Sequence, residues 1–446
     1  MIRKTTPLAI LLLGLLPAAA MASELPDFAK GIRAGQIVAI SDGDFVGQTY
    51  ADGRLAPAAA GFADLLSVIA LDGRGRSSAS VRVSNSVTAA PEILAVTEDG
   101  RTAFVTERLG ERPSTGETTR DLPPGRRLFA LDLSDKAKPI LVATQEIPAF
   151  PEALALSPDG RTVATVSNTP EASFVTLSGY GDRRFGPARS FDLAKLGVTG
   201  TAKGPRGGVT ATNVQWHPQG RILAVNINTQ DRVAFLALDE AGALRPWGEP
   251  VTVGRDPFVG RFSPDGRFYL TSNWGRDFAA TSLDGRLPST PSTISVVRLG
   301  GASSSQMPAA HERLLDVATG NSAEGLAISP DGSLVATVNM HTTAFPPSSP
   351  RFVRNGSVTL LRFDGASGAL TKIADYPFEG VLPEGGTFDL AGEHFLATVF
   401  HGHAGASPDA GPGLETFRVV KGEAPRLERL GRIPMPHGVH HVVVTR

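Results

Sequence analysis

The 446-residue chain contains no cysteine. Disulfide bonds, thiolate metal sites and a cysteine nucleophile are therefore excluded, and an oxidising compartment poses no chemical threat to the protein. An excess of charge of one sign is also lacking, because 43 basic residues are balanced by 44 acidic ones and no basic run occurs. Nucleic acid and anionic membrane surfaces are consequently poor candidate partners.

Long apolar runs are scarce as well. The run Leu8–Leu16 follows the charged residues Arg3 and Lys4 and precedes a small-residue cleavage site that ends at Ala22. This order is typical of a secretory signal peptide, and the run is shorter than the roughly 20 apolar residues that span a bilayer. We therefore predict that residues 1–22 are a cleaved signal and that the protein is periplasmic or secreted, not an integral membrane protein. A retained signal anchor is the alternative.

What the chain has in abundance is an internal repeat. The phrase Pro-Glu-x-Leu-Ala-(Leu/Ile)-Ser-Pro-Asp-Gly-Arg recurs with a period of about 60 residues, and its clearest copies begin at Pro151 and Ala323. Weaker copies end at Gly100, Gly220, Gly266 and Gly392. A fixed period of this length is typical of repeat architectures.

Each copy is predicted to form two strands joined by a tight turn. Apolar residues such as Leu154, Leu156 and Val163 alternate with small or polar ones, which is the period-2 pattern of a packed sheet. Pro-Asp-Gly supplies the turn between them. Two further β-rich runs follow before the next copy, for example 127–133 and 140–144. Four strands per repeat predict the blade of a β-propeller.

The two ends of the chain are predicted to complete one blade together. The run 35–42 resembles a second strand with no first strand before it, and Pro436-His437-Gly438 aligns with Pro383-Glu384-Gly385. A carboxyl-terminal strand that pairs with the amino-terminal sheet would close the ring and remove its open edges. We therefore predict an all-β, seven-bladed propeller of four-stranded blades that forms one domain over residues 23–446. We expect it to be a monomer.

The Ser-Pro-Asp-Gly-Arg turn at 157–161, the blade length and the predicted export resemble the lactonase-like seven-bladed propellers, including the YVTN-repeat group. That resemblance implies a lactone hydrolase, a lactonising isomerase or a non-catalytic relative. A Pro-His pair often opens an inner strand in this group, and Pro436-His437 matches it. Elsewhere the chain departs from the group, because glutamates occupy the equivalent positions. Quinone-dependent propeller dehydrogenases receive no support from three tryptophans and no cysteine.

Polar residues are predicted to gather at the mouth of the central channel, where inner strands begin and second strands end. The first position in each blade is held by Glu92, Glu152, Thr212, Phe258, Glu324, Glu384 and His437, and the second by Asn168, Asn228, Asn273, Asn339, His341 and His401, among others. Long loops leave these exits, and loops on a rigid scaffold often carry function.

The last blades and the closing strand carry the sharpest group. We predict catalytic roles for His437, Glu384, His341 and His401, with Glu384 or His437 as general base and the other two imidazoles stabilising an oxyanion, directly or through a divalent cation. No metal ligands can be specified, and a divalent cation is the one candidate cofactor. Ligand-binding roles are predicted for Glu152, Glu324, Asn168, Asn228, Asn273 and Asn339.

Structural explanations exist for the same residues. A glutamate at the head of an inner strand can cap backbone N–H groups or contact channel water, and asparagines at strand ends are common turn formers. Two functions therefore stay open. One is an exported lactonase-type hydrolase that acts on a lactone or a sugar-acid-like substrate. The other is a non-catalytic binding protein of the cell envelope with a small-molecule or metal site at the channel mouth.

Overall fold

The computed structural model describes residues 25–71, 78–86, 92–198, 209–301 and 310–446. Within them, seven antiparallel sheets of four or five strands form a ring, as the repeats predicted. The inner strands contact one another in cyclic order, from β4 through β8, β13, β18, β22 and β26 to β30 and back to β4. The predicted signal peptide lies outside the described residues. No helix in the described ranges is long and apolar enough to cross a bilayer.

The strands of the seven blades follow in chain order, apart from the closing one. Blade 1 holds β30 (Val439–Thr445), β1 (Gln36–Ser41), β2 (Leu65–Ala70) and β3 (Ser78–Arg82); blade 2 holds β4 (Leu94–Val96), β5 (Thr102–Thr106), β6 (Arg127–Asp132) and β7 (Ile140–Glu146). Blade 3 holds β8 (Pro151–Leu156), β9 (Thr162–Asn168), β10 (Ser173–Gly181), β11 (Arg184–Phe185) and β12 (Arg189–Asp192); blade 4 holds β13 (Ala211–Trp216), β14 (Ile222–Ile227), β15 (Arg232–Leu238), β16 (Leu244–Pro246) and β17 (Val251–Thr252).

The remaining three blades have four strands each. Blade 5 holds β18 (Pro257–Phe262), β19 (Phe268–Asn273), β20 (Thr293–Arg298) and β21 (Glu312–Ala318); blade 6 holds β22 (Ala323–Ile328), β23 (Leu334–Asn339), β24 (Asn355–Asp364) and β25 (Ala369–Glu379); blade 7 holds β26 (Gly386–Phe388), β27 (His394–Val399), β28 (Gly413–Val420) and β29 (Arg426–Pro434). In blades 3 and 4 two short strands share the outer position, since both pair with the third strand.

Helical segments in the described residues are short and lie in the connections. They are α1 (Thr49–Asp52), α2 (Leu283–Arg286), η1 (Asp27–Gly31), η2 (Ala58–Ala60), η3 (Ala194–Leu196), η5 (Asn228–Gln230) and η6 (Pro408–Ala410).

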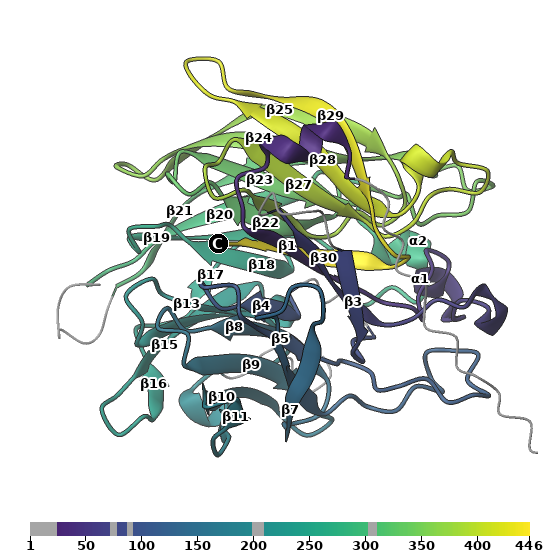
Figure 1. Ribbon diagram of the computed structural model, residues 1–446. Helices are drawn as coiled ribbons and strands as arrows, with labels where there is room; N and C mark the ends of the chain where they lie inside the picture. Colours follow the sequence, from purple (N-terminus) through teal and green to yellow (C-terminus); the bar gives the residue numbers. More distant parts are fainter. Residues whose placement is uncertain (1–24, 72–77, 87–91, 199–208, 302–309) are drawn as a thin grey trace, which may run out of the picture.

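The predicted closure of the ring is confirmed. β1 pairs antiparallel with β30, and the register places Ile37 opposite Val444 and Ala39 opposite Val442. Figure 1 shows the yellow carboxyl-terminal strand beside the purple amino-terminal one. The order β3-β2-β1-β30 therefore makes the last segment of the chain the innermost strand of the first blade.

Apolar layers between neighbouring blades hold the ring together. Between blades 1 and 2, for example, Val38, Ile40, Leu66, Leu94 and Phe129 belong to one buried cluster. Their alternation along each strand puts one apolar face against the next blade, as the period-2 pattern predicted. This rigid ring holds the connections at the channel mouth in place.

Candidate active site at the channel mouth

A β-bulge near the start of the inner strand turns one side chain out of the ladder. In β8, Pro151 pairs with Ser167 and Ala153 with Val166, so Glu152 is the extra residue. The register of β22 shifts in the same way around Glu324. Bulges re-aim side chains and are common beside active sites. Glu152 and Glu324, two of the glutamates that the sequence placed at strand openings, are thus presented by a local irregularity of the sheet.

The same register corrects one sequence alignment. Val439 pairs with Ser41 and His441 with Ile40, so the bulged residue of β30 is His440. His440 therefore holds the position of Glu324 in the first blade, whereas His437 lies three residues earlier, in the connection before the strand. Pro436 and Gly438 suggested the wrong alignment, because proline and glycine are also common in turns such as the one that precedes β30.

Glu324 and Glu384 form a buried carboxyl pair at the mouth. Both side chains are fully buried. Tyr50, from α1, donates a hydrogen bond of 3.1 Å to Glu384 Oε1. Glu384 Oε2 and both carboxyl oxygens of Glu324 have no hydrogen-bond partner among the described residues. Unpaired buried carboxyl groups are costly and mark this pair as unusual.

The two carboxyl groups hold protons more tightly than usual. Burial raises the pKa of Glu384 from 4.5 to about 8, although the Tyr50 hydrogen bond acts in the opposite direction. Burial also raises the pKa of Glu324 well above its usual value, the charge of Glu384 adds to this, and Arg276 opposes it. At neutral pH the pair can therefore keep at least one proton, which makes it a candidate general acid.

A largely buried arginine lies near this pair. Arg276 forms a bidentate ion pair with Asp256, with distances of 2.7 Å from Nε to Oδ2 and 3.0 Å from Nη2 to Oδ1. Its guanidinium lies 3.9 Å from the ring centroid of Trp274. Burial acts to lower the pKa of Arg276, but Asp256 and Glu324 more than offset it, and the pKa is raised. Arg276 thus supplies a fixed positive charge beside Glu324.

The other two inner-strand glutamates have cationic partners. Arg108 Nε lies 2.9 Å from Glu152 Oε2. Arg261 Nη2 lies 2.8 Å from Glu92 Oε1, an ion pair between blades 5 and 2. Both carboxylates are thereby neutralised by arginines of other elements. These ion pairs favour a structural role for Glu92 and Glu152. Glu324 and Glu384 have no such cationic partner among the described residues.

His401 and His437 are brought together at the rim. Their rings stack with centroids 5.6 Å apart. His401 Nε2 accepts a hydrogen bond from Gly47 N–H (2.9 Å), and its Nδ1 bonds the Gly402 carbonyl (2.7 Å), so both ring nitrogens are engaged. His437 Nε2 bonds the Phe45 carbonyl at 2.7 Å. Because a carbonyl only accepts, Nε2 carries the hydrogen and Nδ1 holds the lone pair.

Both rim imidazoles are neutral at physiological pH. Burial lowers the pKa of His401 to about 4, against the opposing effect of the Gly402 carbonyl, and His437 contributes to the lowering. Burial also lowers the pKa of His437, opposed by the Phe45 carbonyl. His437 is therefore a free base near pH 7, whereas His401 is occupied by backbone contacts.

His341 lies apart from this pair. Its backbone has a positive φ of 52°, and its Nε2 is 2.8 Å from the Ser357 hydroxyl of β24. Burial lowers the pKa of His341. Of two residues in the outer strand β25, Asp375 opposes this lowering and Lys372 adds to it. The ring is thus directed along blade 6, and no contact joins it to His401 or His437.

The predicted asparagines mostly bond within the blades. Asn168 bonds Ala211 and Ser173, Asn273 donates to Thr293 and Ser295, and Asn339 bonds Thr337, Ser357 and Thr359. Asn228 is buried with Oδ1 lacking a hydrogen-bond partner in the described chain. A ligand-binding role for these amides stays a prediction.

The connection between β1 and β2 covers the rim, and the sequence interpretation missed it. Residues 42–64 supply Tyr50 to Glu384, the Gly47 amide to His401 and the Phe45 carbonyl to His437. Phe62 stacks face to face on His437, with centroids 3.7 Å apart and planes 5° apart. A polar connection with no repeat motif gave no sequence signal, because its partners lie more than 330 residues away along the chain.

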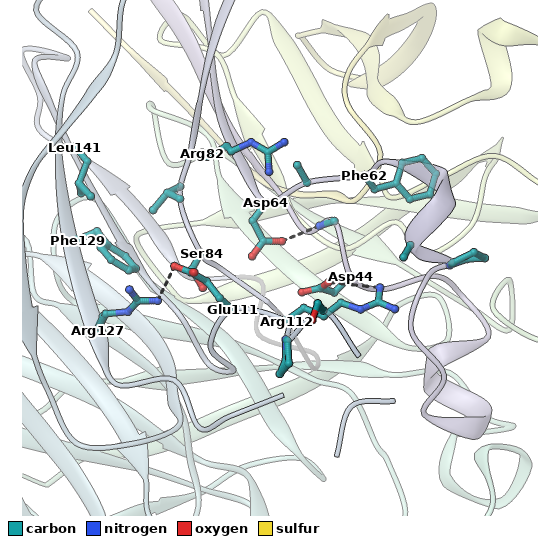
Figure 2. Close-up of a pocket in the computed structure, with 17 residues that line it drawn as sticks. Asp44, Phe62, Asp64, Arg82, Ser84, Glu111, Arg112, Arg127, Phe129 and Leu141 are labelled. Carbon is teal, nitrogen blue, oxygen red and sulfur yellow. Dashed lines mark hydrogen bonds and ion pairs between the residues drawn. The ribbon is translucent and has the colours of Figure 1, made fainter. Parts of the chain in front are cut away.

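A cavity of about 510 Å³ lies beside this connection, between blades 1 and 2 (Figure 2). Its lining includes Phe62, which rests on His437, together with Asp44, Asp64, Arg112 and Arg127. The volume falls within the range of small-molecule sites, about 300–1,000 Å³. The mixed charge of its wall suits a polar ligand rather than an apolar one.

Glu324→Gln is expected to change how stability depends on pH. A raised folded-state pKa means that the folded protein keeps a proton which the unfolded chain releases above its ordinary pKa near 4.5. The stabilisation is complete below that pH and is lost as pH rises towards the folded value. Thermal melts should show similar Tm values for variant and wild type at pH 5, and a variant Tm several degrees higher at pH 9.

The exposed Glu171→Gln substitution is the matched control and should show no such divergence. A Tm difference between Glu324→Gln and wild type that stays constant from pH 5 to pH 9 would show that Glu324 titrates normally in the folded protein.

Comparisons with known proteins support the fold. No protein-family model matches the sequence, and no curated protein matches it. Solved structures do match. A "putative 6-phosphogluconolactonase" from Bacteroides uniformis is 15% identical, and a periplasmic gluconolactonase from Pseudomonas aeruginosa is 17% identical. Each matches with a TM-score of 0.59 and covers 92% of this chain and 99% of the other. A functionally unknown protein from Desulfotomaculum acetoxidans, 14% identical, matches with the same TM-score and coverage. The chain therefore has the seven-bladed fold of the lactonase-like propellers, the resemblance that its repeats indicated.

Proposed function

We propose that the protein is an exported hydrolase that opens lactones of sugar acids at the mouth of its central channel. The observation that carries the proposal is the buried pair Glu324 and Glu384, whose carboxyl groups have raised pKa values and oxygens without partners. Pairs of titratable groups with perturbed pKa values are typical of acid–base sites. Burying the unpaired carboxyl groups of Glu324 and Glu384 costs stability, so a functional role explains their position better than a structural one.

The chemistry of lactone opening needs one base and one acid. A base removes a proton from water, the water oxygen bonds the carbonyl carbon, and the ring C–O bond breaks as an acid protonates the departing alkoxide oxygen. His437 Nδ1 serves as the base. The protonated member of the carboxyl pair, Glu384, serves as acid. The charge of Arg276 stabilises the oxyanion of the tetrahedral intermediate.

The roles predicted for the other two histidines change in this proposal. His401 positions the rim connection through the Gly47 amide rather than binding the oxyanion. His341 takes no part in the chemistry, since its contact is with Ser357. The cavity between blades 1 and 2 reaches Phe62, which stacks on His437, but its lining includes neither His437 nor the carboxyl pair.

The substrate class and the location rest on separate support. The structural neighbours include a gluconolactonase described as periplasmic and a "putative 6-phosphogluconolactonase". The sequence of residues 1–22 matches a secretory signal, and the absence of cysteine suits an oxidising compartment. We infer that this chain acts on a sugar-acid lactone outside the cytoplasm.

A non-catalytic binding protein is the second candidate. One observation favours it: His401, Asn168 and Asn339 are all engaged in internal hydrogen bonds, which leaves few free groups for chemistry. A thermal-shift screen with sugar-acid lactones separates the two candidates. A lactone that raises Tm without being opened would support binding, whereas release of the hydroxy acid would support hydrolysis.

His437→Ala is expected to lower kcat/KM for lactone opening by about 100-fold, the lower range for loss of a general base. The fold should survive, because the ring lies at the rim and not within an apolar layer. Acid release at constant pH measures the rate. His403→Ala, which removes a neighbouring rim imidazole that bonds the Arg354 carbonyl, is the control and should retain most activity. Equal rates for His437→Ala and wild type would remove His437 from the mechanism.

A further inference from the structure

Three carboxylates meet at the two ends of the rim connection. Asp42 and Asp44 begin it after β1, and Asp64 ends it before β2. Each offers an oxygen, and these oxygens all lie within 4.8 Å of one another. Figure 2 shows the carboxyl groups of Asp44 and Asp64 pointing towards the same space in the cavity between blades 1 and 2.

The carboxylates are held in place by backbone groups. Asp42 Oδ1 accepts from the amides of Asp44 (2.7 Å) and Phe45 (3.2 Å). Asp64 Oδ1 accepts from the Gly43 amide and Oδ2 from the Asn85 amide, both at 2.9 Å. Since backbone N–H groups fix the orientation of each carboxylate, the three remain close together despite their mutual repulsion.

One guanidinium lies close to the carboxylates. Arg112 Nη1 lies 3.8 Å from Asp44 Oδ1, a longer ion pair than those of the inner-strand glutamates. A divalent cation bound among the three carboxylates would offset their mutual repulsion.

A buried hydroxyl provides an independent sign of a ligand. Ser84 lies in the segment that follows β3 and lines the same cavity as Asp44 and Asp64. It is only 8% exposed, and its Oγ has no hydrogen-bond partner in the described chain. Its neighbour Ser86, by contrast, donates to Asp44 Oδ2 at 2.6 Å. Buried polar groups without a partner often indicate an ion or water that completes the site.

We propose that Asp42, Asp44 and Asp64 bind one Ca²⁺, with the Ser84 hydroxyl as a further oxygen ligand. A set of oxygen donors without imidazole or thiolate selects a hard cation. Ca²⁺ binds oxygen at about 2.3–2.6 Å, so oxygens on opposite sides of the ion are about 4.6–5.2 Å apart. At the 4.8 Å limit, three mutually equidistant oxygens lie about 2.8 Å from their common centre, so a shift of a few tenths of an ångström lets all three contact one Ca²⁺.

The proposed ion would clamp the rim connection at both of its ends. The segment between Asp44 and Asp64 carries Tyr50, whose hydroxyl contacts Glu384, and Phe62, which stacks on His437. Closing the two stems together would fix these contacts and thereby order the channel mouth. This site is distinct from the metal that the sequence suggested at the histidines. Ca²⁺ binding does not depend on the proposed lactonase activity.

The experiment is calorimetric titration of the full chain with Ca²⁺ after treatment with a chelator. We expect one Ca²⁺ per chain and a rise in Tm with Ca²⁺ concentration, because a ligand that binds only the folded state stabilises it. Asp44→Asn and Asp64→Asn should each weaken binding by at least about tenfold. Asp52→Asn, in the same connection but outside the cluster, should bind as wild type does.

Two further measurements keep the proposal falsifiable. In chelator, Asp44→Asn should melt at or above the wild-type Tm, because it removes repulsion, which shows that its loss of binding is not unfolding. Ca²⁺ should also slow proteolysis within residues 45–63 in the wild type and not in Asp44→Asn. No heat of binding and no Tm change in millimolar Ca²⁺ would overturn the proposal. So would Mg²⁺ binding as tight as Ca²⁺, or unchanged affinity in both variants.

Discussion

Replacing Glu384 by glutamine is expected to lower kcat for lactone opening by at least about 100-fold, since general acid–base groups contribute about 10²–10⁴. Glutamine has the shape of the protonated acid and can still accept the Tyr50 hydrogen bond, but it cannot transfer a proton. The substitution removes no ion pair, so the fold should be retained. Initial rates of acid release, with circular dichroism of the same samples, measure both effects.

The pH profile gives the sharper form of this prediction. With a pKa of about 8, Glu384 is protonated below that pH, so an acid role makes activity fall as pH rises through it. The Tyr50 hydrogen bond lowers this pKa, and Tyr50→Phe should therefore move the fall in activity to higher pH. The exposed Glu171→Gln substitution is the control. A Glu384→Gln enzyme with wild-type kcat, or a profile that Tyr50→Phe leaves unmoved, would show that Glu384 is not the acid.

Removing the closing strand, by truncation after Met435, is expected to abolish the folded state. Val439 and Val442 are fully buried in β30, and their loss alone costs about 3 kcal/mol or more. The unpaired edge of β1 and the uncovered inner strands β4 and β26 add to this, against a total stability of about 5–15 kcal/mol for a typical protein. Far-ultraviolet circular dichroism and a thermal melt measure the effect.

Truncation of Arg446 alone is the matched control, because β30 ends at Thr445, and it should melt close to the wild type. A synthetic peptide spanning residues 436–446 should restore some structure to the truncated chain, since β1 presents its free edge. A truncated protein with a cooperative melt at the wild-type Tm would mean that the ring does not depend on β30.

The fold could be predicted because the information for it is local and repeated. Each Pro-Asp-Gly turn fixes a hairpin, and the alternation around Leu154 or Leu326 fixes which face packs against the next blade. The missing inner strand of the first blade was visible as the unpaired run 35–42. These signals require only neighbours in sequence, and the structure confirms the seven blades and their closure.

The candidate site was predicted only in part, because its contacts join distant segments. The glutamates were located by counting from each turn glycine, and Glu324 and Glu384 do lie together. The connection that carries Asp44, Tyr50 and Phe62 has no repeat motif, and only ring closure brings it over the last blades. Sequence periodicity contains no information about such a contact.

Small differences in register and in backbone conformation also could not be predicted from the sequence. A three-residue difference in register gives His440, not His437, the bulged position of β30. The positive φ of His341 directs its ring to Ser357, although its spacing from the turn glycine equals that of His401. Bulges and left-handed residues change side-chain direction without changing the pattern of residue types.

The most direct test is the rate of acid release from a sugar-acid δ-lactone at constant pH, with and without the purified wild-type protein. The account predicts hydrolysis well above the spontaneous rate, and none of this acceleration with Glu384→Gln at the same concentration. A folded wild-type protein that leaves the spontaneous rate unchanged across a panel of such lactones would contradict the proposed function of the channel mouth.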